Sequence, residues 1–129
     1  MKENHTKSAY SESWFRDGIV YQVIDPQVKK ISLDIAKQLV ADRTVAMTSL
    51  QAGARVYVVV NNALSVEKEA KKYYDTGVPY ENITAIGMLM NNYVARLVGN
   101  VVFLFDKQPV PISFFNSQEK AIEWLRKQS

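Results

Sequence analysis

The segment RVYVVV at residues 55–60 restricts the fold more than any other part of the chain. Its apolar residues follow one another without the polar alternation of a half-buried strand, so both faces of the strand must be covered. A strand of this kind is typical of the centre of a parallel sheet. The run therefore predicts an α/β fold in which helices pack on a mostly parallel sheet.

Strand and helix patterns alternate along the rest of the chain. The motif Asp17–Gly18 between two strand-like runs predicts an N-terminal β-hairpin, with strands at about 9–15 and 19–24. Apolar residues at helical spacing predict a helix from Ser32 to about Leu50, closed by Gly53 as its C-cap. The later expected elements are a helix that begins at Ser65 and stops at Gly77, a strand at 81–90, a helix at 92–105, a strand at 112–115, and a last helix capped by Asn116–Ser117. Residues 1–8 are expected to be a flexible N-terminus and residues 9–128 a single domain.

Composition excludes several chemistries. The chain has no cysteine and one histidine, His5, so a disulfide scaffold, a cysteine-based zinc site and a thiol nucleophile are excluded, and no metal or cofactor is expected. No nucleophile–base pair can be assembled, which indicates a non-enzymatic protein. The net charge of +3 is modest and acidic residues flank most basic ones, which argues against a nucleic-acid partner. No apolar run approaches 18 residues and no leader pattern is present, which favours a cytoplasmic protein without membrane insertion.

Four segments suggest a family. They are RDGIVY at 16–21, ALSVEKEAKKYY at 63–74, AIGMLMNNYVARLVGNVV at 85–102 and FFNSQEKAIEWL at 114–125. Together with the hairpin and the regular βα units, they make the chain resemble the STAS domain fold of the SpoIIAA-like anti-sigma-factor antagonists, most closely a group of small bacterial proteins with that fold. The resemblance implies a STAS-like sheet and a regulatory or protein-interaction role.

Ser65 has two open interpretations. In the phospho-regulated antagonists that this chain resembles, a serine at the start of the helix after a central strand is phosphorylated, and Ser65 stands at a comparable junction. The surrounding sequence NNALSVEKE lacks the acidic residue and the Ser-Gly pair that such proteins carry there. Alternatively, the Ser65 side chain is simply the N-cap of its helix.

Asparagines follow three of the predicted strands. The carboxyl ends of parallel strands lie on one rim of a sheet, where open α/β proteins bind ligands. Asparagine is also a preferred N-cap, so capping is the alternative explanation. The candidate rim for a ligand or partner consists of Asn61, Asn62, Asn91, Asn92, Arg96 and Asn116.

The expected helix at 92–105 is apolar on nearly every side, with Arg96 as its only charge over residues 92–105. A helix of this kind is usually buried on two sides. The second cover is a second subunit or another protein, the rest of the same chain, or a lipid-like ligand. Tyr93, Val98 and Phe103 are the candidate interface residues for a homodimer.

Two functions follow from these observations. The first is a non-enzymatic protein-interaction or regulatory module of the STAS-like type, forming a homodimer and binding an unidentified protein partner. The alternative is a protein that binds a small anionic or amphipathic ligand near the rim and Arg96.

Overall fold

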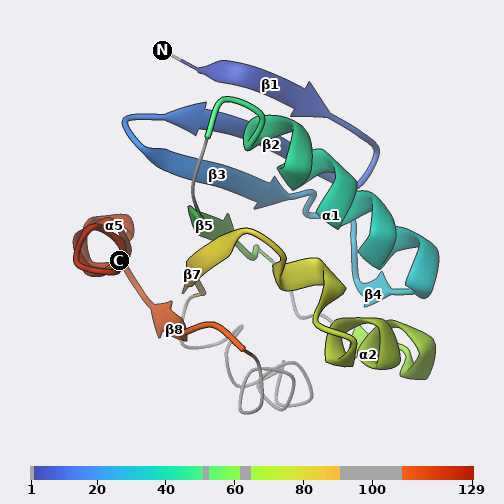
Figure 1. Cartoon of the computed structure of the whole chain (residues 1–129). Helices are drawn as coiled ribbons and strands as arrows, with labels where there is room; N and C mark the ends of the chain where they lie inside the picture. The colour runs from blue at the N-terminus through green and yellow to red at the C-terminus, as the bar shows by residue number, and fades with distance from the viewer. Residues whose placement is uncertain (1, 51–52, 62–64, 91–108) are drawn as a thin grey trace.

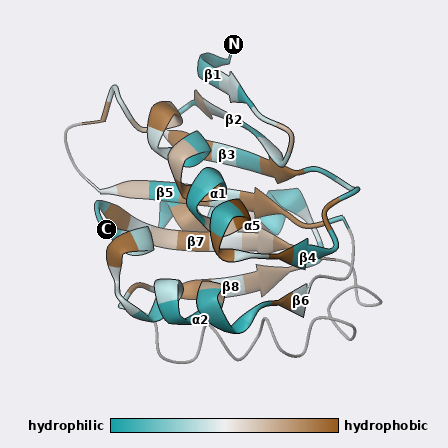
Figure 2. Cartoon of the chain, turned by 90° about the vertical axis from the view of Figure 1, so that its right-hand side faces the viewer, coloured by the Kyte–Doolittle hydropathy of each residue, from teal (hydrophilic) through white to brown (hydrophobic). Residues whose placement is uncertain are grey.

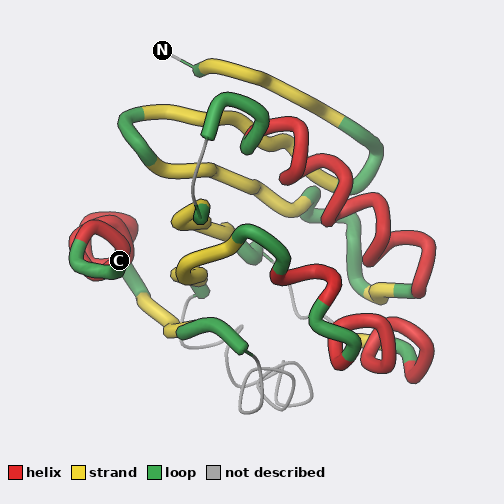
Figure 3. Tube along the Cα trace, in the orientation of Figure 1, coloured by secondary structure: helices red, strands yellow, loops and turns green. Residues whose placement is uncertain are grey.

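The computed structural model describes residues 2–50, 53–61, 65–90 and 109–129, so the helix expected at 92–105 lies outside the described residues. Figures 1 and 3 show a mixed α/β fold with its strands in one main sheet and helices on both sides. In chain order the described elements are β1 (Glu3–Lys7), β2 (Ser11–Arg16), β3 (Ile19–Ile24), β4 (Lys30–Ile31), α1 (Leu33–Ala46), β5 (Ala54–Val59), β6 (Ser65–Val66), α2 (Lys68–Asp75), the 3-10 helix η1 (Val78–Tyr80), β7 (Ile83–Leu89), β8 (Ile112–Phe115) and α5 (Gln118–Arg126).

The main sheet has six strands in the order β1-β2-β3-β5-β7-β8, and β4 pairs with β6 in a separate two-stranded sheet. The strands β3, β5, β7 and β8 run parallel to one another, whereas β1 pairs antiparallel with β2 and β2 antiparallel with β3 at one side of the sheet. Because β5 lies between β3 and β7, the prediction of a central parallel strand from residues 55–60 is confirmed.

The hairpin predicted at Asp17–Gly18 is confirmed. Both residues have positive φ, 50° at Asp17 and 82° at Gly18. A two-residue hairpin turn with positive φ at both positions is the type whose twist matches that of the flanking strands. The turn pairs Arg16 with Ile19 and so sets the register of β2 against β3.

The N-terminal residues form a strand, where the sequence predicted a flexible segment. β1 pairs antiparallel with β2, with Lys7 opposite Glu12. It also packs against α1, and Asn4 Nδ2 donates to Ser49 Oγ (3.1 Å) in the segment that follows that helix. The polar composition gave no sign of this strand, because its stability comes from the β2 ladder and from partners distant in sequence.

Helices cover the two faces of the sheet unequally. On one face, α1 packs on β1, β2 and β3, and α2 packs beside α1; Figure 2 views the molecule from this side, with both helices in front of the sheet. On the other face, α5 packs on β5, β7 and β8. Among the described residues, no helix covers β1 and β2 on the α5 side.

The core accordingly divides into two parts. The larger part lies under α1 and α2 and includes Val56, Ile86 and Leu39. The smaller part lies under α5, where Leu125 and Ala121 pack against Tyr57 and Ile19. None of the described helices is long and apolar enough to cross a membrane.

The ends of α1 show one confirmed and one wrong prediction. Ser32 is its N-cap and accepts a hydrogen bond from the Ile35 amide (3.2 Å). The helix ends at Ala46, short of Leu50, because a tight turn satisfies its last carbonyls through the Met47 amide. Gly53 is therefore not a C-cap. It precedes β5, where a β-carbon would collide with the Thr84 hydroxyl.

Candidate docking surface

The predicted asparagine rim is described only in part. Asn61 follows β5 and Asn116 follows β8, and both are exposed at the carboxyl ends of parallel strands. The two strands are separated by β7, so their ends lie about 10 Å apart at the usual strand spacing. The structure therefore places Asn61 and Asn116 on the same rim of the sheet but does not bring them together. The other rim residues, Asn62, Asn91, Asn92 and Arg96, lie outside the described residues.

The predicted helix capping at Ser65 is wrong. Ser65 belongs to β6, which pairs in parallel with β4, and its amide donates to the Lys29 carbonyl (3.0 Å). The helix α2 begins at Lys68, after Glu67 as its N-cap residue. The short ladder with β4 holds Ser65 in an extended conformation, so the helix begins at Lys68 and not directly after Ser65. The Ser65 side chain is exposed.

At the last helix the capping residue is Ser117, whose Oγ accepts a hydrogen bond from the Lys120 amide (3.1 Å). Asn116 stands one residue earlier and is exposed. The predicted interface residues Tyr93, Val98 and Phe103 lie outside the described residues. None of the sequence-predicted candidates is thus brought into a shared site by the described part of the structure.

The structure instead reveals an aromatic group on the sheet. Trp14 of β2 and Tyr21 of β3 stack with ring centroids 5.4 Å apart and planes 3° apart. Tyr21 meets the ring of Tyr57 on β5 edge to face, with centroids 5.6 Å apart. These residues are direct cross-strand partners. The row runs from the open half of the sheet to the part under α5, where Tyr57 is buried at 1% exposure.

The burial of Tyr57 affects its hydroxyl. Burial raises the pKa of the Tyr57 phenol to about 12, and nearby Tyr21 adds to the effect. Its hydroxyl is buried and has no described hydrogen-bond partner. Tyr57 is therefore a neutral packing group at physiological pH, whereas Trp14 and Tyr21 are only half-buried and remain available for contacts.

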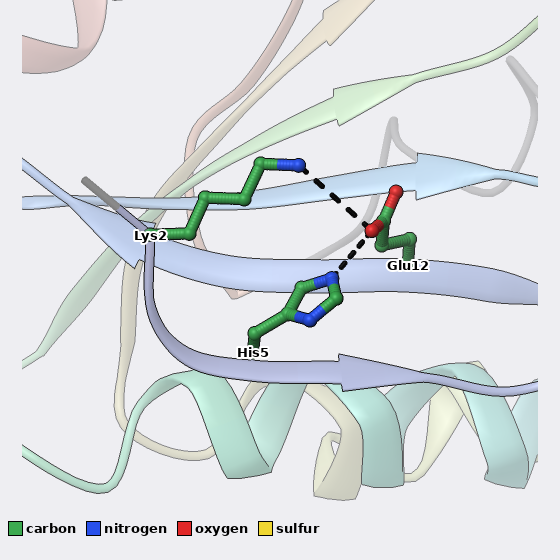
Figure 4. A network of polar contacts seen from close by, with 3 residues as sticks. All are labelled: Lys2, His5 and Glu12. Atoms are coloured by element: carbon green, nitrogen blue, oxygen red, sulfur yellow. Dashed lines mark hydrogen bonds and ion pairs between the residues drawn. The ribbon is translucent and has the colours of Figure 1, made fainter.

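A polar edge borders the aromatic group on the N-terminal side. Its residues Lys2, His5 and Glu12 are drawn in Figure 4. His5 Nε2 hydrogen-bonds to the Glu12 carboxylate, and Lys2 Nζ lies 3.8 Å from the same carboxylate. The Lys2 ammonium also lies 4.0 Å from the centre of the Trp14 ring, a cation–π arrangement. The hydrogen bond with His5 lowers the pKa of Glu12, against the opposing effect of partial burial.

A groove lies on the other side of the aromatic group, between β3 and α5. It has a volume of about 580 Å³ and is lined by Tyr21, Gln118, Glu119, Ile122, Glu123 and Arg126. Arg126 Nη1 donates to the Asp17 carbonyl oxygen (3.1 Å), which ties the end of α5 to the hairpin turn. The groove therefore lies between the face of the β2–β3 hairpin and the side of α5.

We call this surface the open face. It consists of His5, Glu12, Trp14, Arg16 and Tyr21 on the side of β1–β3 opposite α1, together with the groove beside α5. Strand alternation places these side chains on one face, because Ser11 and Phe15 point to the α1 side. Sequence reasoning missed the open face, although the Asp17–Gly18 turn alone pairs Trp14 with Tyr21.

A buried polar network supports the hairpin from the other side. The Asp42 carboxylate of α1, 2% exposed, accepts hydrogen bonds from Ser8 Oγ (2.6 Å), Ser11 Oγ (2.8 Å) and Gln38 Nε2 (2.8 Å). Gln22 Nε2 donates to Ser11 Oγ (3.1 Å) and to the Leu39 carbonyl (2.8 Å). Such a network is stable only when its members are satisfied, and it fixes α1 against β2 and β3.

Arg43 is the second unusual buried group. It is 6% exposed, and its Nη2 donates to the Pro79 carbonyl oxygen. No described residue accepts a hydrogen bond from its Nε, and the described ion pairs do not include it. Burial lowers the pKa of Arg43, although the neighbouring phenols of Tyr74, Tyr80 and Tyr73 act in the opposite direction. A guanidinium held in this way is costly to bury.

The comparisons with known proteins identify a family. Its description is a domain of unknown function (DUF7793), and it matches residues 13–129, so β1 and the first residues of β2 precede the match. Neither a curated protein nor a solved structure matches the chain. In the described part of the chain, no group of three or more histidine, aspartate or glutamate side chains could hold a metal ion. Because the match covers most of its length, the chain belongs to the DUF7793 family.

Proposed function

We propose that this protein is a non-enzymatic protein-interaction module of the STAS-like type that works in the cytoplasm and docks a partner on its open face. The observation that supports the proposal is the Trp14–Tyr21 stack, which is only half-buried although it lies beside the core. Tyrosine and tryptophan are enriched at the energetically dominant positions of protein interfaces. They supply a large contact area with few rotatable bonds, and the polar edge and groove give this area defined borders.

Support for binding over catalysis comes from the titratable groups of the same surface. His5 and Glu12 are engaged with each other, and the hydroxyl of Tyr57 is buried beneath the aromatic row. The remaining polar groups are exposed charges, which are suited to setting the orientation and association rate of a partner.

The test is a quantitative pull-down from cells that naturally make the protein. Tagged wild type is compared with Trp14→Ser and with Lys37→Ser, a control on the exposed surface of α1. We expect a discrete set of proteins that the wild type and the control enrich equally and that Trp14→Ser loses by about tenfold, the usual scale for an aromatic anchor. Circular dichroism checks that each variant is folded. Equal enrichment by all three proteins, or none, rejects the open face as a docking surface.

The homodimer is a separate part of the proposal. Its contact was predicted at Tyr93, Val98 and Phe103. Native mass spectrometry of wild type and Val98→Asp tests it: a dimer that becomes a folded monomer supports the contact, and an unchanged association state rejects it.

Arg43 supports a second candidate function, the binding of a small anion. No described residue pairs with its Nε or with the buried hydroxyl of Tyr80, and both groups are hydrogen-bond donors suited to a carboxylate or phosphate. Titration with inorganic phosphate, followed by amide NMR shifts, tests this function. Saturable shifts around Arg43 that disappear in Arg43→Met support it, whereas shifts that are linear or unchanged in Arg43→Met reject it.

A further inference from the structure

We infer that the site at Arg43 takes a small tetrahedral oxyanion, such as phosphate, which replaces the Pro79 carbonyl oxygen on the guanidinium and rotates the Pro79–Tyr80 peptide of η1. The inference rests on the second candidate function proposed above, the binding of a small anion, and does not involve the open face. It is carried by one juxtaposition of three buried groups: a guanidinium without a described carboxylate partner, a phenol hydroxyl without a described acceptor, and a backbone carbonyl bound to one nitrogen of that guanidinium.

The charge of Arg43 has no described counter-ion. The side chain lies in the last turn of α1 and is 6% exposed. Among the described residues, the groups that act on its charge are the phenols of Tyr73, Tyr74 and Tyr80, and none of them is a carboxylate. A helix C-terminus favours a cation, but this effect is small beside the cost of removing a charge from water. An anion from solution would supply the missing negative charge.

Two buried donors need an acceptor. In the part of the chain that the structure describes, nothing accepts a hydrogen bond from Arg43 Nε or from the Tyr80 hydroxyl. Burial lowers the pKa of Arg43 and the Tyr80 phenol opposes this shift, so the two groups lie near each other. A chloride ion is a single acceptor atom, whereas an ion with several oxygens can accept from both donors in their own directions.

The guanidinium is only partly used by its present partner. Its Nη2 donates to the Pro79 carbonyl oxygen. Nε and Nη2 lie on the same side of an arginine side chain, where they form a fork that fits two oxygens of one carboxylate or phosphate. A carbonyl has one oxygen, so it fills one half of this fork. An oxyanion would fill both halves, and a third oxygen would accept from the Tyr80 hydroxyl. Three donors therefore favour a tetrahedral oxyanion over a planar carboxylate.

An anion can reach these donors only when a covering segment moves, because Arg43 and Tyr80 are 6% and 5% exposed. The segment bound to the guanidinium is η1. Residues with positive φ stand on both sides of it, Gly77 at 83° and Asn82 at 62°. Backbone rotation at a few residues that end a short segment is the usual way in which such a segment opens.

The bound state differs from the described one at a single peptide. The Pro79 carbonyl leaves Arg43 when the peptide between Pro79 and Tyr80 rotates. This rotation changes ψ of Pro79 and φ of Tyr80, and the proline ring fixes neither angle. The amide of the same peptide, Tyr80 N–H, now donates to the Gly77 carbonyl (3.0 Å) and would lose this hydrogen bond. The Tyr80 amide therefore reports whether the anion takes the place of the carbonyl.

Phosphate titration of the full chain tests the inference. The measurement is NMR at constant pH and constant ionic strength, with chloride as the background anion. It follows the Tyr80 amide and the Nε–H signal of Arg43, which is assigned by its loss in Arg43→Met. Acetate is the second probe, as a planar carboxylate. Tyr80→Phe removes the hydroxyl, and Tyr73→Phe is the matched control at a half-buried phenol on α2.

We expect saturable phosphate shifts at both signals in wild type, and binding of acetate that is about tenfold weaker. Tyr80→Phe should stay folded, because its hydroxyl has no described partner to lose. It should weaken phosphate binding by about tenfold, the scale of one hydrogen bond to a charged group, whereas Tyr73→Phe should leave the affinity unchanged.

The outcomes separate the inference from the anion-binding function. Saturable shifts at Arg43 Nε–H with an unchanged Tyr80 amide overturn the inference and leave anion binding standing. Equal affinity in Tyr80→Phe and wild type, or acetate binding as tight as phosphate binding, does the same. Phosphate shifts that do not saturate, or that persist in Arg43→Met, overturn both.

Discussion

Trp14 and Tyr21 stack almost in parallel, with ring planes 3° apart, because a two-residue turn leaves their strands only one register. Asp17 and Gly18 adopt the positive φ angles that this turn requires, and residues at equal distances from the turn then face each other. The main feature of the open face is therefore determined by two residues that do not belong to it.

The stack is expected to stabilise the hairpin in solution. In a double-mutant cycle of Trp14→Ala and Tyr21→Ala, we expect a coupling free energy of about 0.5–1.5 kcal/mol, the range for aromatic pairs beyond their burial. Urea denaturation of the four proteins measures it. Trp14→Ala combined with Tyr73→Ala on α2 is the matched control and should be additive within about 0.5 kcal/mol. Additivity in both cycles would show that the rings do not stack in solution.

Asp42 is expected to be important for the attachment of β1. Asp42→Asn removes the charge that accepts hydrogen bonds from Ser8 and Ser11, and we expect a loss of about 1–3 kcal/mol in the free energy of unfolding. Amide hydrogen exchange in β1 should accelerate most. Asp75→Asn, at an exposed carboxylate, should change stability by less than about 0.5 kcal/mol. Equal effects of the two substitutions would contradict the role of the buried network.

Local signals predicted the parts of the fold that depend on neighbouring residues. Turns and helix caps are determined by a few adjacent residues. A segment of about six residues was enough to predict each of four features: the Asp17–Gly18 turn, the N-caps Ser32 and Ser117, and the buried strand at 55–60. The structure confirms all four. The alternation of strands and helices then predicted the α/β class.

Apart from the end of α1, where a local turn at Met47 stops the helix, the wrong predictions involve contacts between distant segments. Ser65 has the residue type of an N-cap, but the Lys29 carbonyl, 36 residues earlier, draws it into a ladder. The strand β1 is polar and is held by β2, by α1 and by Ser49 beyond the end of that helix. The open face depends on which half of the sheet α5 covers, and periodicity in one segment carries no information about that choice. The pairing of Trp14 with Tyr21 was the part of this surface that the sequence could have predicted.

Arg43 is expected to lower stability in the absence of a bound anion. Its guanidinium is buried, and its Nε has no partner among the residues that the structure describes. Arg43→Met should therefore leave the free energy of unfolding unchanged or raise it, as when other buried charges are replaced by apolar residues. Arg43→Lys keeps a buried charge without the hydrogen-bonding geometry to Pro79 and should be destabilising. Urea denaturation compares the three proteins. A large loss in Arg43→Met would mean that Arg43 is fully paired in solution.

The hydrogen bond between His5 and Glu12 is expected to make stability depend on pH in the acidic range. It holds the pKa of Glu12 below its ordinary value of 4.5, so Glu12 binds its proton more weakly in the folded chain than in the unfolded chain. A group of this kind contributes stability above its unfolded pKa and loses it as the pH falls through the folded pKa. Wild type should therefore have a higher urea midpoint than Glu12→Gln at about pH 6, and the difference should vanish on acidification towards about pH 2. In a His5→Asn background the difference should be much smaller at every pH. A difference that persists at low pH would mean that Glu12 acts through packing and not through its charge.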